Sequence, residues 1–212
     1  MRIALLSLLT ILCLMLAVAP AMADTLYSNG AYNGTVDAWA INFGFSVSDS
    51  FTTASGANVQ GLNIVYWDLS SSDILTTVDM ALGTTSFGGT PQTLTGVTNT
   101  FLSVNRFGYN LYEASYLFAG IPWSDAGFMT LSNACTTSGC SFTTPIYWDE
   151  NSGPSTAYDN TLGSIPSEAF TLIGGECGVG RPDCGPTPEP SSIMLFGSGI
   201  LGLAGILRRR LF

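Results

Sequence analysis

Residues 59–67 read Val-Gln-Gly-Leu-Asn-Ile-Val-Tyr-Trp, the pattern of a buried β-strand. Successive side chains of a strand point to opposite faces, so Leu62, Ile64 and Tyr66 share one apolar face. The other face is also apolar, at Val65 and Trp67. Because both faces are apolar, we expect this strand to lie in the interior of a β-sheet protein.

Short segments of the same kind occur on both sides of this strand. They alternate apolar and polar residues and are separated by Gly, Ser, Thr and Asn, which is typical of strands joined by turns. No helical segments alternate with them, so a parallel sheet is disfavoured. We therefore predict an all-β domain at 24–173, an antiparallel β-sandwich of jelly-roll type. Its other strands are expected at 40–47, 75–82, 92–104 with a bend at Gly96, 109–118, 127–131, 145–148 and 169–173.

Residues 1–23 have the three parts of a secretory signal peptide. After a positive start, residues 3–18 form an apolar run broken only twice, and Ala21 and Ala23 form a small-x-small cleavage site. This pattern predicts export through the secretion machinery and cleavage by signal peptidase, with Asp24 as the first residue of the mature chain. An uncleaved anchor helix is the alternative.

The other end of the chain predicts one transmembrane helix. Residues 191–207 carry no charge, and at ~1.5 Å per residue they reach roughly 26 Å, close to the ~30 Å hydrocarbon core of a bilayer. Arg208, Arg209 and Arg210 follow at once. Because positive residues stay cytoplasmic, the helix is expected to run from outside to inside. The Gly- and Pro-rich residues 174–187 are interpreted as a stalk between domain and helix.

The part of the chain between the two ends, 24–187, is strongly acidic. It contains fourteen acidic residues against two basic ones, Arg106 and Arg181, and the chain has no His. A net charge of about −12 repels phosphate backbones, which argues against binding to nucleic acid. The lack of His removes the commonest general base, the commonest transition-metal ligand and the Ser-His-Asp triad.

Four cysteines lie in this exported part: Cys135, Cys140, Cys177 and Cys184. An oxidising compartment favours disulfides, and four cysteines allow three connectivities. The simplest is the pairing of each cysteine with its nearer neighbour, because each pair then closes a small loop that contains glycine. A metal site is the alternative, but it requires tighter spacing and usually His.

Pro188-Glu189-Pro190 precedes the apolar helix and the three arginines at the end of the chain. This order, over residues 188–212, closely resembles the PEP-CTERM sorting signal of exported bacterial proteins, a tail also named the ice-binding protein C-terminal domain. Two prolines keep the tripeptide extended and prevent the helix from beginning early. The resemblance implies that an exosortase, a membrane-embedded cysteine transpeptidase or protease, recognises Pro188, Glu189 and Pro190 and cuts near them. A rigid linker before a permanent anchor is the alternative.

The same resemblance implies a location. The chain would be held transiently in the inner membrane and then be released or transferred to a surface acceptor, in the cell envelope or in the exopolysaccharide matrix of a biofilm. The middle of the chain also resembles a group of β-rich PEP-CTERM proteins that share an aromatic-Trp-Asp strand end, here at 147–149, and a later Ser-Glu-x-Phe strand, here at 167–170. That second resemblance covers about 50–173 and supports the fold rather than an activity.

A dense cluster of polar and aromatic residues follows one predicted strand. Trp148, Asp149, Glu150 and Asn151 are consecutive, and Asp159 follows after a Gly-Pro turn. The indole would stack on a sugar ring while the carboxylates and amide bond its hydroxyl groups. The same oxygens suit calcium, which takes six to eight oxygen ligands. The alternative is a strand end with Trp148 packed in the core and the acids solvated in the next loop.

A second acidic loop, with Asp68 and Asp73, follows the strand at 59–67. The loops of a sandwich gather at its two edges. These two acids are therefore candidates to converge with Asp149.

Together these features predict a non-enzymatic exported protein of the cell surface or extracellular matrix, with exosortase as its processing partner and extracellular polysaccharide as a candidate ligand. A calcium-stabilised adhesive or structural module is the second hypothesis, and no other cofactor is expected. A small glycan hydrolase is the third, because paired carboxylates suffice for glycoside cleavage. Ice binding is not expected, since the threonines follow no regular repeat.

Overall fold

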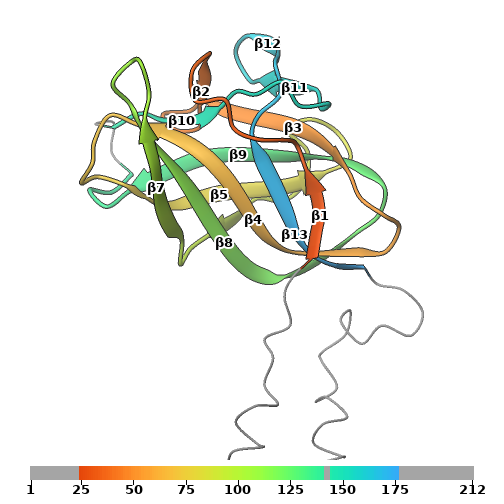
Figure 1. Cartoon of the computed structure of the whole chain (residues 1–212). Coiled ribbons are helices and arrows are strands. Elements are labelled where there is room, and N and C mark those ends of the chain that lie inside the picture. The colour runs from red at the N-terminus through yellow and green to blue at the C-terminus, as the bar shows by residue number, and fades with distance from the viewer. Residues whose placement is uncertain (1–23, 141–143, 177–212) are drawn as a thin grey trace, which may run out of the picture.

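The computed structural model describes residues 24–140 and 144–176 (Figure 1). This part forms two antiparallel sheets, so the all-β prediction is confirmed, while its jelly-roll type stays a prediction. The predicted signal peptide, most of the stalk, the membrane helix and the sorting tail lie outside the described residues. Within those residues, no helix has the length and apolar character needed to span a bilayer.

The first sheet is built around one long central strand. That strand is β4, and every strand that pairs with it runs antiparallel to it. The strands of the first sheet are β1 (Asp24–Ser28), β2 (Ala38–Ala40), β4 (Ala57–Asp68), β7 (Thr98–Val104), β8 (Asn110–Trp123), β10 (Ile146–Asp149) and β13 (Phe170–Glu176).

The second sheet faces the first and has the order β12-β11-β3-β9-β5-β6. Its long strand β9 pairs with β3 on one edge and β5 on the other. The strands of the second sheet are β3 (Ser46–Thr52), β5 (Leu75–Gly83), β6 (Gln92–Leu94), β9 (Ala126–Thr136), β11 (Ala157–Asp159) and β12 (Gly163–Ile165).

Inward-facing side chains of both sheets form a single hydrophobic core. Leu62, Ile64 and Tyr66 of β4 are fully buried, as their spacing predicts, and they belong to the same core cluster as Met129 and Leu131 of β9. Burying large apolar side chains stabilises the fold by about 1.5–3 kcal/mol each. The core therefore holds the two sheets face to face.

One edge of β4 is shared by two strands. β8 pairs with β4 along its whole length, so β13 and β10 must both use the other edge, β13 along the first part and β10 along the last. Where one strand gives way to the other, residues 149–151 and 167–169 bond to each other through an isolated antiparallel bridge between Glu150 and Glu168. We call this place the fork.

Two predicted strands are interrupted where the chain crosses between the sheets. Residues 40–47 were expected to be one strand, but the chain turns at 42–45, with Phe43 and Gly44 in the left-handed region, and this prediction is wrong. The segment 92–104 divides into β6 and β7 on different sheets at Gly96, where φ is +71°. The other predicted strands are confirmed, although β8 and β9 each extend five residues beyond their predicted ends, and β13 runs three residues into the predicted stalk.

The two ends of the described chain lie side by side. Asp24 in β1 pairs with Gly174 in β13, and both strands reach the lower edge of the molecule in Figure 1. The predicted signal cleavage site and the chain that leads to the tail therefore leave from the same end of the fold.

Candidate functional site

Four acidic side chains surround the fork, and we call them the acid junction: Asp49, Asp149, Glu150 and Glu168. Each of the other three acts electrostatically on the carboxyl group of Glu168. Two members come from the predicted polar cluster, and two were not selected from the sequence.

Trp148 is part of the core rather than a surface platform. Its side chain is fully buried, its indole N–H donates to the Ala169 carbonyl at 2.9 Å, and its ring meets Phe170 edge to face. Alternation along β10 explains this, because Ile146 and Trp148 share the inward face. Trp148 therefore lies in the core, as the alternative interpretation predicts, but the acids that follow it are buried rather than solvated.

Asp149 points to the outer face of the first sheet, where it is nevertheless fully buried. Its carboxylate accepts hydrogen bonds from the main-chain N–H groups of Asn33 at 2.7 Å and Gly34 at 2.8 Å, and from the Trp67 indole at 2.5 Å. Burial raises its pKa, while these three donors lower it. Asp149 thereby pins the loop between β1 and β2 onto the sheet.

The side chains of Asn151 and Asp159 also form hydrogen bonds to nearby groups of the protein. The Asn151 side-chain amide donates to the Asn29 carbonyl at 2.7 Å and accepts from the Ser167 hydroxyl at 2.8 Å. Asp159 accepts from the main-chain N–H of Thr161 at 2.8 Å and so caps the turn between β11 and β12. The predicted role of the cluster in binding sugar or calcium stays a prediction, but its polar atoms are largely engaged inside the protein.

Glu168 is the most unusual side chain of the acid junction. It is fully buried, and within the described chain neither carboxylate oxygen has a hydrogen-bond partner. Its bridge partner Glu150 stands directly opposite on the same face and accepts from the Trp39 indole at 3.3 Å. Burial raises the pKa of Glu168 well above its usual value, and the nearby negative charges, led by Asp49, raise it further.

Asp49 reaches the fork from the second sheet. It lies on the inward face of β3 between Val47 and Phe51 and is fully buried. One carboxylate oxygen accepts from the main-chain N–H of Glu168 at 2.7 Å, while the other has no partner among the described residues. Burial raises the pKa of Asp49 to about 6, against the lowering effect of the Ser155 hydroxyl and of main-chain donors.

The chemistry open to Asp49 and Glu168 follows from this enclosure. Two carboxyl groups without a basic partner resist ionising together, so the charge of Asp49 adds to burial in raising the pKa of Glu168. No group of three or more acidic or cysteine side chains in the described ranges is arranged to hold a metal ion. The pair is closed to solvent, so its direct consequence is for stability.

Asp68 and Asp73 come together, but Asp149 does not join them. Asp68 is fully buried opposite Ile146, on the inward face, and its pKa rises to about 6 because of burial and the charge of Asp73. The nearby Thr136 side chain and two donors to the carboxylate, the Thr144 hydroxyl at 2.7 Å and the Ser138 main-chain N–H at 2.8 Å, hold the pKa of Asp73 below its usual value. Asp149 lies on the opposite face of the sheet, so the three acids form no common site.

Sequence reasoning did not select Asp49 or Glu168, the two buried acids at the fork. A signal for Asp49 was available, because the alternation of Val47, Asp49 and Phe51 directs all three side chains to the same face. Glu168 belongs to the Ser-Glu-x-Phe pattern that was used only to support the fold. Neither signal reveals that the two carboxyl groups meet.

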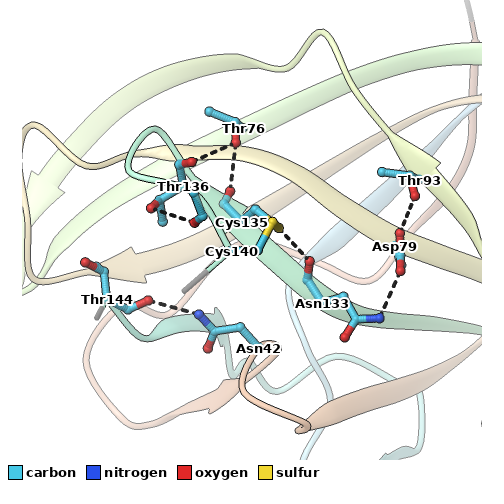
Figure 2. Close-up of a disulfide and its surroundings, with 10 residues drawn as sticks. Asn42, Thr76, Asp79, Thr93, Asn133, Cys135, Thr136, Cys140 and Thr144 are labelled. Carbon is cyan, nitrogen blue, oxygen red and sulfur yellow. Dashed lines mark hydrogen bonds between the residues drawn. A yellow bond between two sulfur atoms is a disulfide. The ribbon is translucent and has the colours of Figure 1, made fainter. Parts of the chain in front are cut away.

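One disulfide joins Cys135 at the end of β9 to Cys140, which confirms that predicted pairing (Figure 2). The hydroxyl of Thr76 donates to the Cys135 carbonyl at 3.0 Å beside it. Cys177 and Cys184 lie outside the described residues, and their pairing stays a prediction.

Residues 186–210 match the family model of the PEP-CTERM protein-sorting motif. The chain therefore carries this motif, and the resemblance seen in Pro188-Glu189-Pro190 and the three arginines is confirmed. The motif implies export and processing by an exosortase. Searches of curated proteins and of solved structures found no match to the chain.

Proposed function

We propose that this chain is a non-enzymatic protein of the bacterial surface or extracellular matrix, exported and then cut by an exosortase at Pro188-Glu189-Pro190. The match of residues 186–210 to the sorting motif carries the proposal. The C-terminal helix holds the protein in the inner membrane until cleavage. The folded domain is then released into, or attached within, an exopolysaccharide layer that supplies its ligand.

The domain itself supports a binding or structural role. Its two antiparallel sheets share one core, as expected for the proposed β-sandwich of jelly-roll type. A glycoside hydrolase needs two carboxyl groups that flank a substrate. Asp149, Asp49 and Glu168 are instead fully buried among protein groups, which disfavours the hydrolase hypothesis.

The intact mass of the protein recovered from the producing bacterium tests the sorting step. The expected product lacks residues 1–23 and everything after about Pro190. The variant Glu189→Ala should keep the whole tail, because the exosortase recognises this tripeptide, while Pro182→Ala, outside the matched segment, should be processed normally. A wild-type product that retains the C-terminal helix would show a permanent anchor and overturn the proposal.

A calcium-stabilised adhesive or structural module is the second candidate. The described ranges contain no group of three or more acidic side chains arranged for a metal ion, so this candidate rests on three buried carboxylate oxygens, two of Glu168 and one of Asp49, that have no partner there. Oxygen ligands of this kind suit calcium. A melting temperature that rises with added calcium and falls with chelator, but is insensitive to both in Glu168→Gln, supports this candidate. Equal melting temperatures of the wild type with calcium and with chelator reject it.

A further inference from the structure

The solvent face of the second sheet carries an open hollow that the acid junction does not share. It consists of a cavity of about 410 Å³ and a neighbouring one of about 220 Å³, which have Gly44 and Asn133 in common. The turn at 42–45 and the loop that joins β5 to β6 form its walls. We call this hollow the sheet groove. Its larger part lies within the range of about 300–1,000 Å³ that is usual for ligand sites.

The floor of the sheet groove is a chain of three polar side chains from three adjacent strands. Asp79 of β5 accepts a hydrogen bond from the Thr93 hydroxyl at 2.6 Å and another from the Asn133 amide at 2.9 Å. Figure 2 shows Asp79 between these two partners, close to the disulfide. Alternation along β5 puts Asp79 on the face opposite Val78 and Met80, which are in the core.

A β-bulge brings Asn133 to this face. Thr77 pairs with Cys135 and Asp79 pairs with Ser132, so two residues of β9 oppose one of β5. Asn133 takes the left-handed conformation there, with φ of +51°. Bulges often re-aim a side chain beside a functional site. Here the bulge adds an amide to the side of the sheet that already presents Asp79 and Thr93.

Aromatic residues in strained conformations line the walls. Phe43 and Phe87 have φ of +61° and +59°, and with Asn133 they are three of the four non-glycine residues with positive φ in the described ranges. This conformation is costly for bulky residues and is retained at ligand sites more often than elsewhere. Phe87 is 42% exposed and the neighbouring Phe45 is 40% exposed, so neither ring is buried in the core.

These groups fit an uncharged sugar chain. Asp79 and Asn133 offer the acceptors and donors that adjacent hydroxyl groups of a sugar require. Exposed phenyl rings offer apolar surface to the C–H face of a sugar ring, in the usual combination of aromatic walls and a few polar groups. The groove lining contains no basic residue in the described chain, which disfavours phosphate, sulfate or carboxylate ligands.

We propose that the sheet groove binds a segment of a neutral extracellular polysaccharide, with Asp79 and Asn133 bonding sugar hydroxyls and Phe87 packing on a sugar ring. This inference rests on the proposed function for the location of the protein.

The position of the groove in the fold is also favourable for binding. Asn133 lies near the end of β9, whereas Ala126 at its start lies near Trp123 and the strand end at Glu176. The groove therefore lies away from the end of the fold at which β13 ends.

The test measures binding of the secreted, processed protein to an array of short, linear, neutral oligosaccharides of hexose and N-acetylhexosamine units, followed by calorimetry on the best of them. Asp79→Asn should weaken binding at least tenfold, which is about 1.4 kcal/mol, because a carboxylate acceptor is replaced by an amide. Phe87→Ala should weaken it by a similar factor. Asp125→Asn, the same change at an exposed acid at the other end of β9, should bind as the wild type does.

Two results would overturn the proposal: no binding of the wild type at millimolar oligosaccharide, or equal affinities of Asp79→Asn and Asp125→Asn. Urea unfolding of each variant shows that a loss of binding is not a loss of fold. The mass of the same preparation separates this proposal from the proposed function. A correctly trimmed protein that binds no sugar refutes the groove alone, and an untrimmed protein that binds sugar refutes the sorting step alone.

Discussion

The acid junction and the sheet groove both present carboxylates, but in opposite settings. At the junction, Asp49 and Glu168 are closed off between the two sheets, and three of their oxygens have no partner in the described chain. In the groove, Asp79 is partly exposed, and each of its oxygens accepts one hydrogen bond. A carboxylate oxygen has two lone-pair sites, so Asp79 retains capacity for a ligand.

The acids of the junction therefore affect the stability of the fold, whereas Asp79 in the groove is available for binding. A buried acid without a cation partner costs free energy, and that cost depends on pH. An exposed acid held by two neighbours costs little and is already oriented for a ligand. Substitutions in the two regions should therefore have different consequences, and the largest effects should occur at the acid junction.

The largest loss of stability is expected for Asp149→Ala. The substitution leaves the N–H groups of Asn33, Gly34 and Trp67 without their acceptor in a buried place, and each orphaned donor costs about 1–3 kcal/mol. We expect the free energy of unfolding in urea to fall by at least about 3 kcal/mol. Glu113→Ala, at a partly exposed acid of β8, serves as the control. A loss at Asp149 no larger than the control would contradict the role given to this carboxylate.

The second prediction concerns pH and Glu168→Gln. Folding raises the pKa of Glu168 above its ordinary 4.5 and that of Asp49 from 3.8 to about 6. The folded state therefore binds more protons than the unfolded state, and stability must fall as pH rises from about 4 through these raised values. For Asp49 alone the shift corresponds to about 3 kcal/mol. The lowered pKa of Asp73 acts in the opposite sense, but only near and below pH 4.

Glu168→Gln removes one of these titrations. The variant should be more stable than the wild type at pH 8, and the difference should vanish near pH 4. Urea unfolding at both pH values measures it. Glu113→Gln on β8 is the matched control and should show no such gain. A destabilised Glu168→Gln at pH 8 would mean that the glutamate is ionised and satisfied in the fold.

A smaller loss is expected when the disulfide beside the sheet groove is removed. The bond between Cys135 and Cys140 closes a short loop, for which chain entropy predicts about 2 kcal/mol of stabilisation. The double variant Cys135→Ala, Cys140→Ala and the reduced wild type should lose the same amount in thermal unfolding. If the double variant melts at the same temperature as the oxidised wild type, the bond does not constrain the chain.

The smallest effect on stability is expected for Asp79→Asn. Its side chain is partly exposed and its partners Thr93 and Asn133 are exposed, so the free energy of unfolding should change by no more than about 0.5 kcal/mol. The urea midpoint checks this directly. A loss of 2 kcal/mol or more would show that the Asp79 network serves the fold and would remove the distinction drawn between the two regions.

Features that depend on interactions local in sequence could be predicted, whereas features that depend on contacts between distant residues could not. The alternation in residues 59–67 predicts β4 because strand periodicity is local. The turn at 42–45 was missed because its apolar residues continue the alternation while Gly44 and Phe43 reverse the chain. β11 and β12 have three residues each, too few for a periodic signal.

The sites depend on contacts that are distant in sequence. Asp49 and Glu168 are 119 residues apart along the chain, and nothing in either segment indicates that they meet. The consecutive acids at 149–150 attracted attention because they are dense, but density in sequence does not show which face of a strand each residue occupies. The sheet groove depends on a bulge in β9, which only the pairing register reveals.

Residue-level mapping of a bound sugar tests the central distinction most directly. The measurement is a ¹H–¹⁵N NMR titration of the processed protein with the neutral oligosaccharide that binds most tightly on the array. The account predicts amide shifts at Asn133, Thr93 and Phe87, with residues 148–151 unchanged. Shifts centred on 148–151, or no shifts at all, would contradict it.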